Sequence, residues 1–557
     1  MMERIIEADH QLKLFFEKYL LNIILIFAFL VRFIGLNAGL PYIYNRPECG
    51  IVNPVINMLV TGNLNTRQFQ WPGSFITYLL AILFGIILAV YYIYSLLCGY
   101  VHNLTEFRHL VRSNPVFYYD KTPILFHFLG RLLMFFFALV TIYLVYLVAK
   151  RLFNKWVGLL AAFCLSISPL HVRWSQFMRP DIAAAMLVMF SLYFLLRFID
   201  ETKNTKWLIL SSLFAGFSIT AKYTSGVIIF PILIHCLITD SKETRLLTGR
   251  YLINFLKIKT NLSRALLFIF IGFFIFAPFV ILDFKHAIKG IMFVAVSSKD
   301  PYLRRLPGIQ NHIWYLKDAL RSSIGGLFFE IFAALGLCSI LYKKLYKEYL
   351  FLVFPVLSYL IMGFGSLRRP HRLMPVYPFE AMLFGVGFYY SYRFIFQRNL
   401  FKAHRLKISL LFIIALIFAS YHPVISDIKH GIELTKPDTR TIAKEWIEKN
   451  LPSGSKIAYE SCVVPLHVKP RSDFTLIFTI DGYSGILSKP LSYYKNQGVN
   501  YIIISCFLQR DLAEVDAKYR ATFSQKYQEL KNGAQLIKCF TRNKETNGPP
   551  IEIYKMK

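Results

Sequence analysis

The stretch Ala265–Ile281, ALLFIFIGFFIFAPFVI, contains no charged residue. A helix needs about 20 mostly apolar residues to cross the hydrocarbon core of a bilayer, and neighbouring residues extend a run of this length. The run Ile408–Ser420, ISLLFIIALIFAS, is equally uncharged. Clustered runs of this kind predict an integral membrane protein that crosses the bilayer many times, and they exclude a soluble protein.

The composition agrees with this prediction. The chain has 557 residues, of which 55% are hydrophobic and 17% charged, whereas soluble domains carry about 25% charged residues. Its formal net charge is +31, and the basic residues collect in loops between apolar runs, as expected for loops on the inner side and for attraction to anionic lipid. We therefore expect membrane lipid, and no nucleic acid, as a partner. The eight cysteines form no C-x-x-C pair, so they predict neither a zinc site nor a disulfide framework.

Eleven apolar segments are predicted to cross the membrane. With the N-terminus inside, every inner loop is basic, and the odd number of crossings leaves the C-terminal part outside. Phe75–Leu97 is also apolar, and we expect it to lie at or dip into the outer face, so the count is about 11–13 helices. The eleven segments are 21–36, 123–148, 157–167, 182–198, 208–220, 226–237, 265–282, 325–341, 349–364, 373–392 and 408–420.

The chain divides into three parts. Residues 1–20 form an amphipathic N-terminal segment without the features of a cleavable signal peptide. Residues 21–421 form the transmembrane module, with a long first outer loop at 37–122, and residues 422–557 form a soluble extracytoplasmic α/β domain. In that domain we predict helices at Arg440–Asn450 and Asp511–Gly533, and strands at Lys456–Glu460, Thr475–Thr479, Tyr501–Ser505, Gln535–Phe540 and Ile551–Lys555.

Two carboxylates stand at helix starts in the predicted outer loops. Glu48 follows the first span, and Asp181 follows Pro180 at the start of another span. A carboxylate at a helix N-terminus is stabilised by the helix dipole, so each is either a simple capping acid or a general base at the outer membrane surface.

Basic residues gather at the same predicted face, against the usual preference for the inner side. Such a group favours binding of an external anion and suits a reaction whose leaving group is a lipid-linked phosphate, with a carboxylate that accepts a proton. No P-loop, G-x-G-x-x-G, H-E-x-x-H or G-x-S-x-G pattern is present. We predict that Lys222, Arg372, Arg369 and Arg179 bind the phosphate, with Arg173, His171 and His371 as further candidates.

Several segments in order resemble the C-type (GT-C) membrane glycosyltransferases, in particular the prokaryotic group related to dolichyl-phosphate-mannose–protein mannosyltransferases and aminoarabinose lipid A transferases. The similar segments are Leu40-Pro-Tyr with Glu48, Met58–Asn65, Ser168–Arg173 up to Asp181, Ala221–Thr224, Arg372–Pro378 and Asp438–Ser455. The resemblance implies a mostly α GT-C fold. It also implies inverting transfer, on the outer face of the plasma membrane, of a sugar from an undecaprenyl- or dolichyl-type phosphate donor.

The resemblance also implies an acid in the first outer loop as catalytic base, usually an Asp within an Asp-Glu pair. Here the pair reads Pro47-Glu48, so Glu48 and Asp181 are the catalytic candidates. The missing Asp leaves open a homologue that binds a lipid-linked sugar without transferring it, and the many spans alone leave open a transporter or flippase. The acceptor is a protein, a lipid or a glycan. No cofactor is implied, and a divalent metal shared by the carboxylates stays open because no ligand spacing is diagnostic.

Overall fold

The protein is described from a computed structural model of the full chain. The structure describes residues 19–69, 73–113, 124–201, 204–243, 258–297, 308–343, 345–364, 368–397, 404–460, 464–466, 473–479, 485–505 and 517–557. Predicted elements outside these ranges, such as Asp511–Asp516 at the start of one predicted helix, lie outside the described residues.

Each of the eleven predicted apolar segments is mostly or wholly helical among the described residues. The first helix covers Tyr19–Phe33. The others are α5 (Ile124–Leu152), α6 (Lys155–Ser166), α8 (Pro180–Asp200), α9 (Thr205–Ala221), η1 with α10 (Tyr223–Ile228, Ile229–Glu243), α12 with α13 (Asn261–Phe276, Pro278–Leu282), α17 (Leu327–Lys343), α18 (Tyr346–Gly363), η3 with α19 (Pro370–Val376, Tyr377–Gln397) and α20 (Arg405–Thr435). The fold class is therefore confirmed as mostly helical.

Length and composition allow fewer complete crossings than eleven. Among the described residues, five helices are long and apolar enough to cross a membrane, or up to seven if two bent helix pairs each count as one span. Four apolar helices are shorter, including α9 and α12. Shorter helices can still lie at membrane depth when neighbouring helices cover their polar ends.

Glycines allow the closest helix contacts in the bundle. A Cβ atom on Gly216 of α9 would lie 2.3 Å from the carbonyl oxygen of Ile269, and one on Gly272 of α12 would lie 2.5 Å from that of Leu213. Because lipid tails are as apolar as the side chains, helices in a bilayer associate largely through such close packing of small residues. These two glycines therefore fix α9 against α12.

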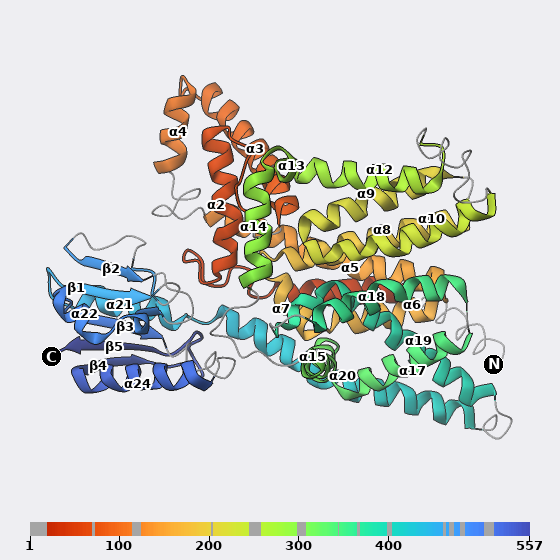
Figure 1. The fold of residues 1–557 in the computed structure, drawn as a ribbon. Helices are drawn as coiled ribbons and strands as arrows, with labels where there is room; N and C mark the ends of the chain where they lie inside the picture. The colour runs from red at the N-terminus through yellow and green to blue at the C-terminus, as the bar shows by residue number, and fades with distance from the viewer. Residues whose placement is uncertain are drawn as a thin grey trace.

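The segment predicted as the first outer loop contains α2 (Arg46–Thr61), α3 (Ser74–Leu97) and α4 (Leu104–Ser113). Figure 1 shows α2 and α14 (Phe284–Ser297) running across the direction of α8, α9, α10 and α12, at one end of the bundle. The α3 helix is long and apolar enough to be a span. Its predicted position at the outer face, without crossing, stays a prediction.

The C-terminal part contains a five-stranded sheet with the strand order β2-β1-β3-β5-β4. The predictions for β1 (Lys456–Glu460), β2 (Thr475–Thr479) and β3 (Tyr501–Ser505) are confirmed residue for residue. β4 (Ala534–Phe540) and β5 (Ile551–Met556) each differ from the prediction by one residue. β1 pairs in parallel with β2 and β3, and β5 pairs antiparallel with β3 and β4.

Helices cover both faces of this sheet. On one face, Ala443 and Ile447 of α21 (Thr439–Asn450) pack with strand residues, and on the other, Tyr494 of α22 (Leu491–Asn496) and Leu530 of α24 (Ala517–Gly533) do so. Helix α20 continues past residue 421 to Thr435, so the sheet begins well after the predicted boundary at 422. The predicted boundary marks the end of the apolar run, whereas the helix itself continues into less apolar residues.

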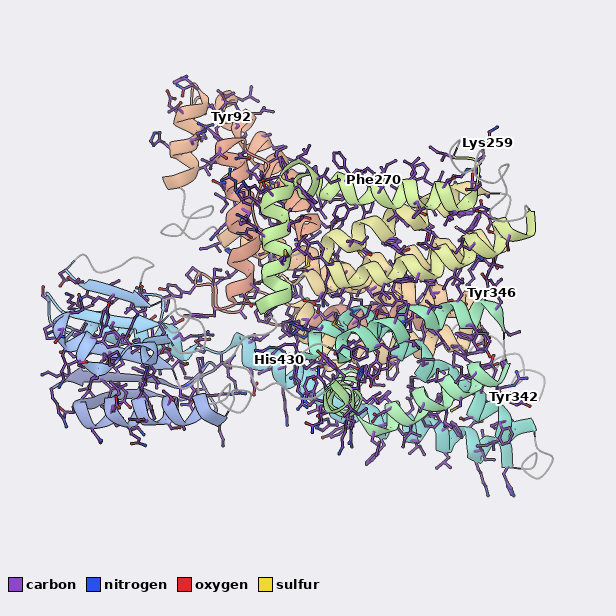
Figure 2. All side chains as sticks on the ribbon, viewed as in Figure 1. Tyr92, Lys259, Phe270, Tyr342, Tyr346 and His430 are labelled. Carbon is purple, nitrogen blue, oxygen red and sulfur yellow. The ribbon has the colours of Figure 1, made fainter. Side chains whose placement is uncertain are left out.

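The sheet domain lies beside the end of the bundle where α2 and α14 are found (Figure 1). Figure 2 places Lys259 and Tyr346 at the opposite end of the bundle, and His430 near the junction with the sheet domain. The basic residue Lys259 and the sheet domain are thus at opposite ends, as the predicted orientation requires. The side of the membrane on which each end lies stays a prediction.

Candidate active site

Glu48 is held in a sealed ion pair. Pro47 lies in the first turn of α2 and Glu48 follows it. The carboxylate accepts hydrogen bonds from Arg131 Nε at 2.9 Å and from its terminal nitrogen at 2.8 Å, and a third at 2.9 Å from the backbone N–H of Met178. The side chains of Glu48 and Arg131 are 0% and 1% exposed. Glu48 therefore fixes Arg131 and the chain at Met178.

Sequence reasoning missed Arg131. It lies within the apolar segment 123–148, and its guanidinium also donates to the backbone carbonyl oxygens of Leu36 and Ala38, at 3.1 and 2.7 Å. A charge inside an apolar span costs at least about 2.5–3.5 kcal/mol on insertion scales, so its presence there was the available signal. Arg131 thus joins α5 to α2 and to the chain that follows the first helix.

Asp181 forms a second buried ion pair, with Lys222. Asp181 lies in the first turn of α8, and Lys222 lies in extended backbone where α9 ends. The Lys222 ammonium donates to Asp181 Oδ1 and, at 3.2 Å each, to the carbonyl oxygens of His371 and Arg372. The side chains of Asp181 and Lys222 are 9% and 12% exposed. This pair is therefore more open than the pair of Glu48 with Arg131.

Further basic side chains surround this pair. Arg179 lies over the ring of Trp174 at 4.2 Å and donates to Asn45 Oδ1 at 3.0 Å. The ring of His371 lies 4.7 Å from that of Trp174. The imidazole of His371 also lies within reach of the charges of Asp181 and Lys222.

Arg372 and Arg369 stand at the start of η3. The backbone N–H of Arg372 donates to the carbonyl oxygen of Arg369 at 3.0 Å, and the charges of both residues act on the Tyr315 hydroxyl. Among the described residues, the guanidinium of Arg372 has no hydrogen bond or ion pair. It is half-buried and thus available to an anion. Asp181, Lys222, Arg179, His371 and Arg372 are called the Asp181 cluster below.

Two of the predicted phosphate-site candidates lie elsewhere. His171 is fully buried, and its Nδ1 lies 3.0 Å from a terminal nitrogen of Arg32, which also donates to the carbonyl oxygens of Leu165 and Ser166. Arg173 is exposed and donates to Ser426 Oγ at 3.1 Å. Both belong to α7 (Pro169–Ser175), where residues two apart point in nearly opposite directions. The Asp181 cluster therefore contains neither.

A large cavity lies between the bundle and the sheet domain. Its volume is about 1220 Å³. Its walls come from the chain at 37–45, from α7 and the residues after it, from the end of α20 and from the loop between β4 and β5. Arg131 and Arg179 line it, so the cavity lies next to both ion pairs. We call it the interdomain cavity.

No metal site is evident in the part of the chain that the structure describes, since no three His, Cys, Asp or Glu side chains are grouped to hold an ion. Glu48 and Asp181 each pair with a cationic side chain instead.

Residues 127–281 match the family model of dolichyl-phosphate-mannose-protein mannosyltransferases. This match confirms the predicted resemblance to the C-type membrane glycosyltransferases, and it includes Arg131, Asp181 and Lys222. Together with the apolar helices, it supports a multi-pass membrane protein of the glycosyltransferase kind. The chain matches no curated protein sequence.

Solved structures with a similar arrangement share little sequence with the chain. One is ArnT from Cupriavidus metallidurans bound to undecaprenyl phosphate, with 11% identity over 76% of this chain and 84% of that chain, and a TM-score of 0.44. Another is the oligosaccharyltransferase AglB from Archaeoglobus fulgidus, in complex with an inhibitory peptide and a dolichol-phosphate, with 12% identity over 92% and 71% of the two chains and a TM-score of 0.48. The A. fulgidus oligosaccharyltransferase tethered with an acceptor peptide is 13% identical over 96% of this chain and 74% of that chain, with a TM-score of 0.49.

Proposed function

We propose that this protein transfers a sugar from a polyprenyl-phosphate donor to an acceptor at the outer face of the membrane. The observation that carries the proposal is the Asp181 cluster, in which a partly open carboxylate stands among cations. The matched family is named for a dolichyl-phosphate sugar, which is a donor of this class.

Lys222 and Arg372 would bind the donor phosphate. In the structure the Lys222 ammonium is neutralised by Asp181, and an incoming phosphate would compete for the same ammonium. Binding of the phosphate to Lys222 would then release the Asp181 carboxylate. Arg372, whose guanidinium has no partner among the described residues, would bind a second phosphate oxygen, and Arg179 and Arg369 would add positive charge.

The chemical step is a displacement at C1 of the sugar. The acceptor oxygen forms a bond to C1 while the bond from C1 to the phosphate oxygen breaks, and the phosphate leaves with that electron pair. The proton of the acceptor hydroxyl passes to a carboxylate. Negative charge grows on the leaving phosphate, so cations beside it stabilise the transition state more than the ground state.

Asp181 is the better placed base. Glu48, the other candidate, has three hydrogen bonds and no exposed surface. We propose that Glu48 instead positions Arg131, which lines the interdomain cavity. The sheet domain would then cover the acceptor on the extracytoplasmic side.

The test uses the full-length protein in lipid nanodiscs with a panel of polyprenyl-phosphate sugars and a mixture of candidate acceptors. Release of polyprenyl phosphate, followed by mass spectrometry, is expected for one donor and should be lost in Asp181→Asn. Neither turnover nor binding with any donor would contradict the proposal.

Binding without turnover would instead point to a homologue that no longer transfers the sugar. In that case Pro47→Asp should restore release of polyprenyl phosphate. Movement of an intact lipid-linked sugar across the membrane, with no bond broken, would favour the transporter alternative.

A further inference from the structure

The interdomain cavity is strongly basic. Six arginine or lysine side chains and one carboxylate, that of Asp438, line it. The six basic residues are Arg131, Arg173, Arg179, Lys436, Arg440 and Arg542. They come from four separate stretches of chain, in the bundle, in the connection after α20 and in the sheet domain.

Half of these charges are already neutralised. Arg131 pairs with Glu48, Arg440 with Asp438, and Arg542 with Glu433. Among the residues that the structure describes, Arg173, Arg179 and Lys436 form no ion pair. A group of unpaired cations around one cavity repels itself and is stabilised when an anion binds. The cavity is therefore built for a ligand that carries negative charge.

The uncharged part of the lining suits a carbohydrate. The side chains of Asn37, Thr435 and Asn547 can both donate and accept hydrogen bonds, as sugar hydroxyls require, and Tyr42 and Phe177 add aromatic surface. A volume of about 1220 Å³ exceeds the size of usual small-molecule pockets, about 300–1,000 Å³. It has room for several sugar rings.

An extended acidic peptide fits the cavity less well. One way in which an extended peptide gains affinity is by adding a strand to an open sheet edge. The edge strands here are β2 and β4, whereas the sheet contributes to the cavity only residues of the loop that joins β4 to β5. The backbone around the cavity thus offers no strand for a peptide to pair with among the described residues.

The cavity and the Asp181 cluster meet at one residue. Arg179 lines the cavity, and its charge also acts on Asp181. The Trp174 ring contacts both Arg179 and His371, and Trp174 also lines the cavity. A ligand in the cavity would therefore end close to the carboxylate that we propose as base.

We infer that the interdomain cavity binds the acceptor, and that this acceptor is a glycan bearing negative charge from phosphate or carboxylate groups. That the bound glycan is an acceptor rests on the proposed sugar transfer. The existence of the anion site does not depend on it. Arg173 and Lys436 recognise the acidic groups, and the donor phosphate stays with Lys222 and Arg372.

The test measures equilibrium binding of three probes to the full-length protein in nanodiscs at low salt: tetragalacturonate, phosphorylated maltotetraose and neutral maltotetraose. At least one charged probe should bind about tenfold or more tighter than maltotetraose, and the better one identifies the acidic group. Arg173→Gln with Lys436→Gln should weaken it about tenfold or more. The control Lys489→Gln, an exposed lysine of the sheet domain outside the cavity, should leave it unchanged.

Each other result overturns the inference. Equal binding of all three probes excludes recognition of charge, and tighter binding of a pentaglutamate peptide than of either charged glycan excludes the glycan. If Lys222→Ala abolishes binding while the Arg173 and Lys436 changes do not, the anion occupies the donor site. Failure of the proposed function is separate, because the charged probe would still bind in the cavity although no donor releases polyprenyl phosphate.

Discussion

The two ion pairs of the candidate site each join a carboxylate to a cation, but they have different surroundings. Arg131 and Glu48 are sealed, and three hydrogen bonds converge on the carboxylate. Lys222 and Asp181 keep some exposure, and the ammonium divides its donors between one carboxylate and two backbone carbonyls. A sealed pair can hold a structure together but cannot exchange a proton with a substrate, whereas an open one can change partners when an anion arrives.

The largest effect is expected at the open pair. Asp181→Asn removes the proposed base and should lower turnover by about 10²–10⁴, the usual contribution of general base catalysis. Donor binding should persist, because Lys222 loses its competitor for the phosphate. Single-turnover kinetics together with a donor-binding measurement check both parts. Undiminished turnover in this variant would assign the base elsewhere.

Breaking the sealed pair should mainly lower the stability of the folded protein. Glu48→Gln leaves the Arg131 charge buried without its partner, which costs about 3–5 kcal/mol, so the thermal unfolding midpoint should fall. The double change Glu48→Gln with Arg131→Met removes both charges and should recover much of the stability.

Turnover in that double variant separates the two roles of Glu48. If Glu48 only positions Arg131, the restored fold should regain part of the activity. If Glu48 is the base, stability returns and turnover does not. Turnover by the double variant at the level of the fully active protein would show that neither residue serves the reaction.

The same contrast explains what the sequence could predict. Asp181 and Lys222 stand out in the sequence because each lies at the end of an apolar run, where a charge is noticeable. The sequence does not predict their pairing across 41 residues, which arises because α8 begins close to where α9 ends. Arg131 does not lie at the end of an apolar run. Its one signal in the sequence is the free-energy cost of placing a charge inside such a run. Its pairing with Glu48 could not be predicted from the sequence, because the contact joins α2 to α5.

Helix faces account for the other differences. His171, Arg173 and Arg179 look like one charged loop in the sequence, but the short helix α7 turns His171 toward Arg32 and Arg173 toward Ser426. The sheet, in contrast, was predictable strand by strand, because β1 and β3 are short apolar runs bounded by turn residues. How the strands are ordered depends on distant pairings and did not follow from those patterns.

A smaller loss of turnover is expected when Arg372, beside the open pair, is changed. Arg372→Ala should lower turnover by about 10²–10³, as expected when a cation is removed from a developing oxyanion. Stability should change little, because the side chain is half-buried and unpartnered in the described part of the chain. Arg372→Lys should recover only part, since lysine keeps the charge without the two-pronged grip. A loss of activity that parallels loss of folded protein would mark Arg372 as structural.

The smallest effect concerns Glu460 of β1, a buried acid that pairs with no cation among the residues that the structure describes. Its carboxylate accepts hydrogen bonds from the backbone N–H groups of Ile486, at 3.0 Å, and Ser505, yet burial raises its pKa to about 7. Between about pH 4.5 and pH 7 the folded protein therefore keeps a proton on Glu460, whereas the unfolded chain, in which the pKa of this group is about 4.5, releases it. Stability from this group should be full below about pH 4.5, decline as the pH rises to about 7 and stay low above that. Glu460→Gln cannot ionise, so it should remove this decline and raise the stability at pH 8 by about 3 kcal/mol. Thermal unfolding of the full-length protein between pH 4.5 and 8 checks this, with Glu545→Gln, an exposed acid of the same domain, as control. The Glu460 variant and the unaltered protein could instead differ in stability by the same amount at every pH. Glu460 would then not be the titrating group, and the two backbone donors would be enough to keep its carboxylate charged without a cation.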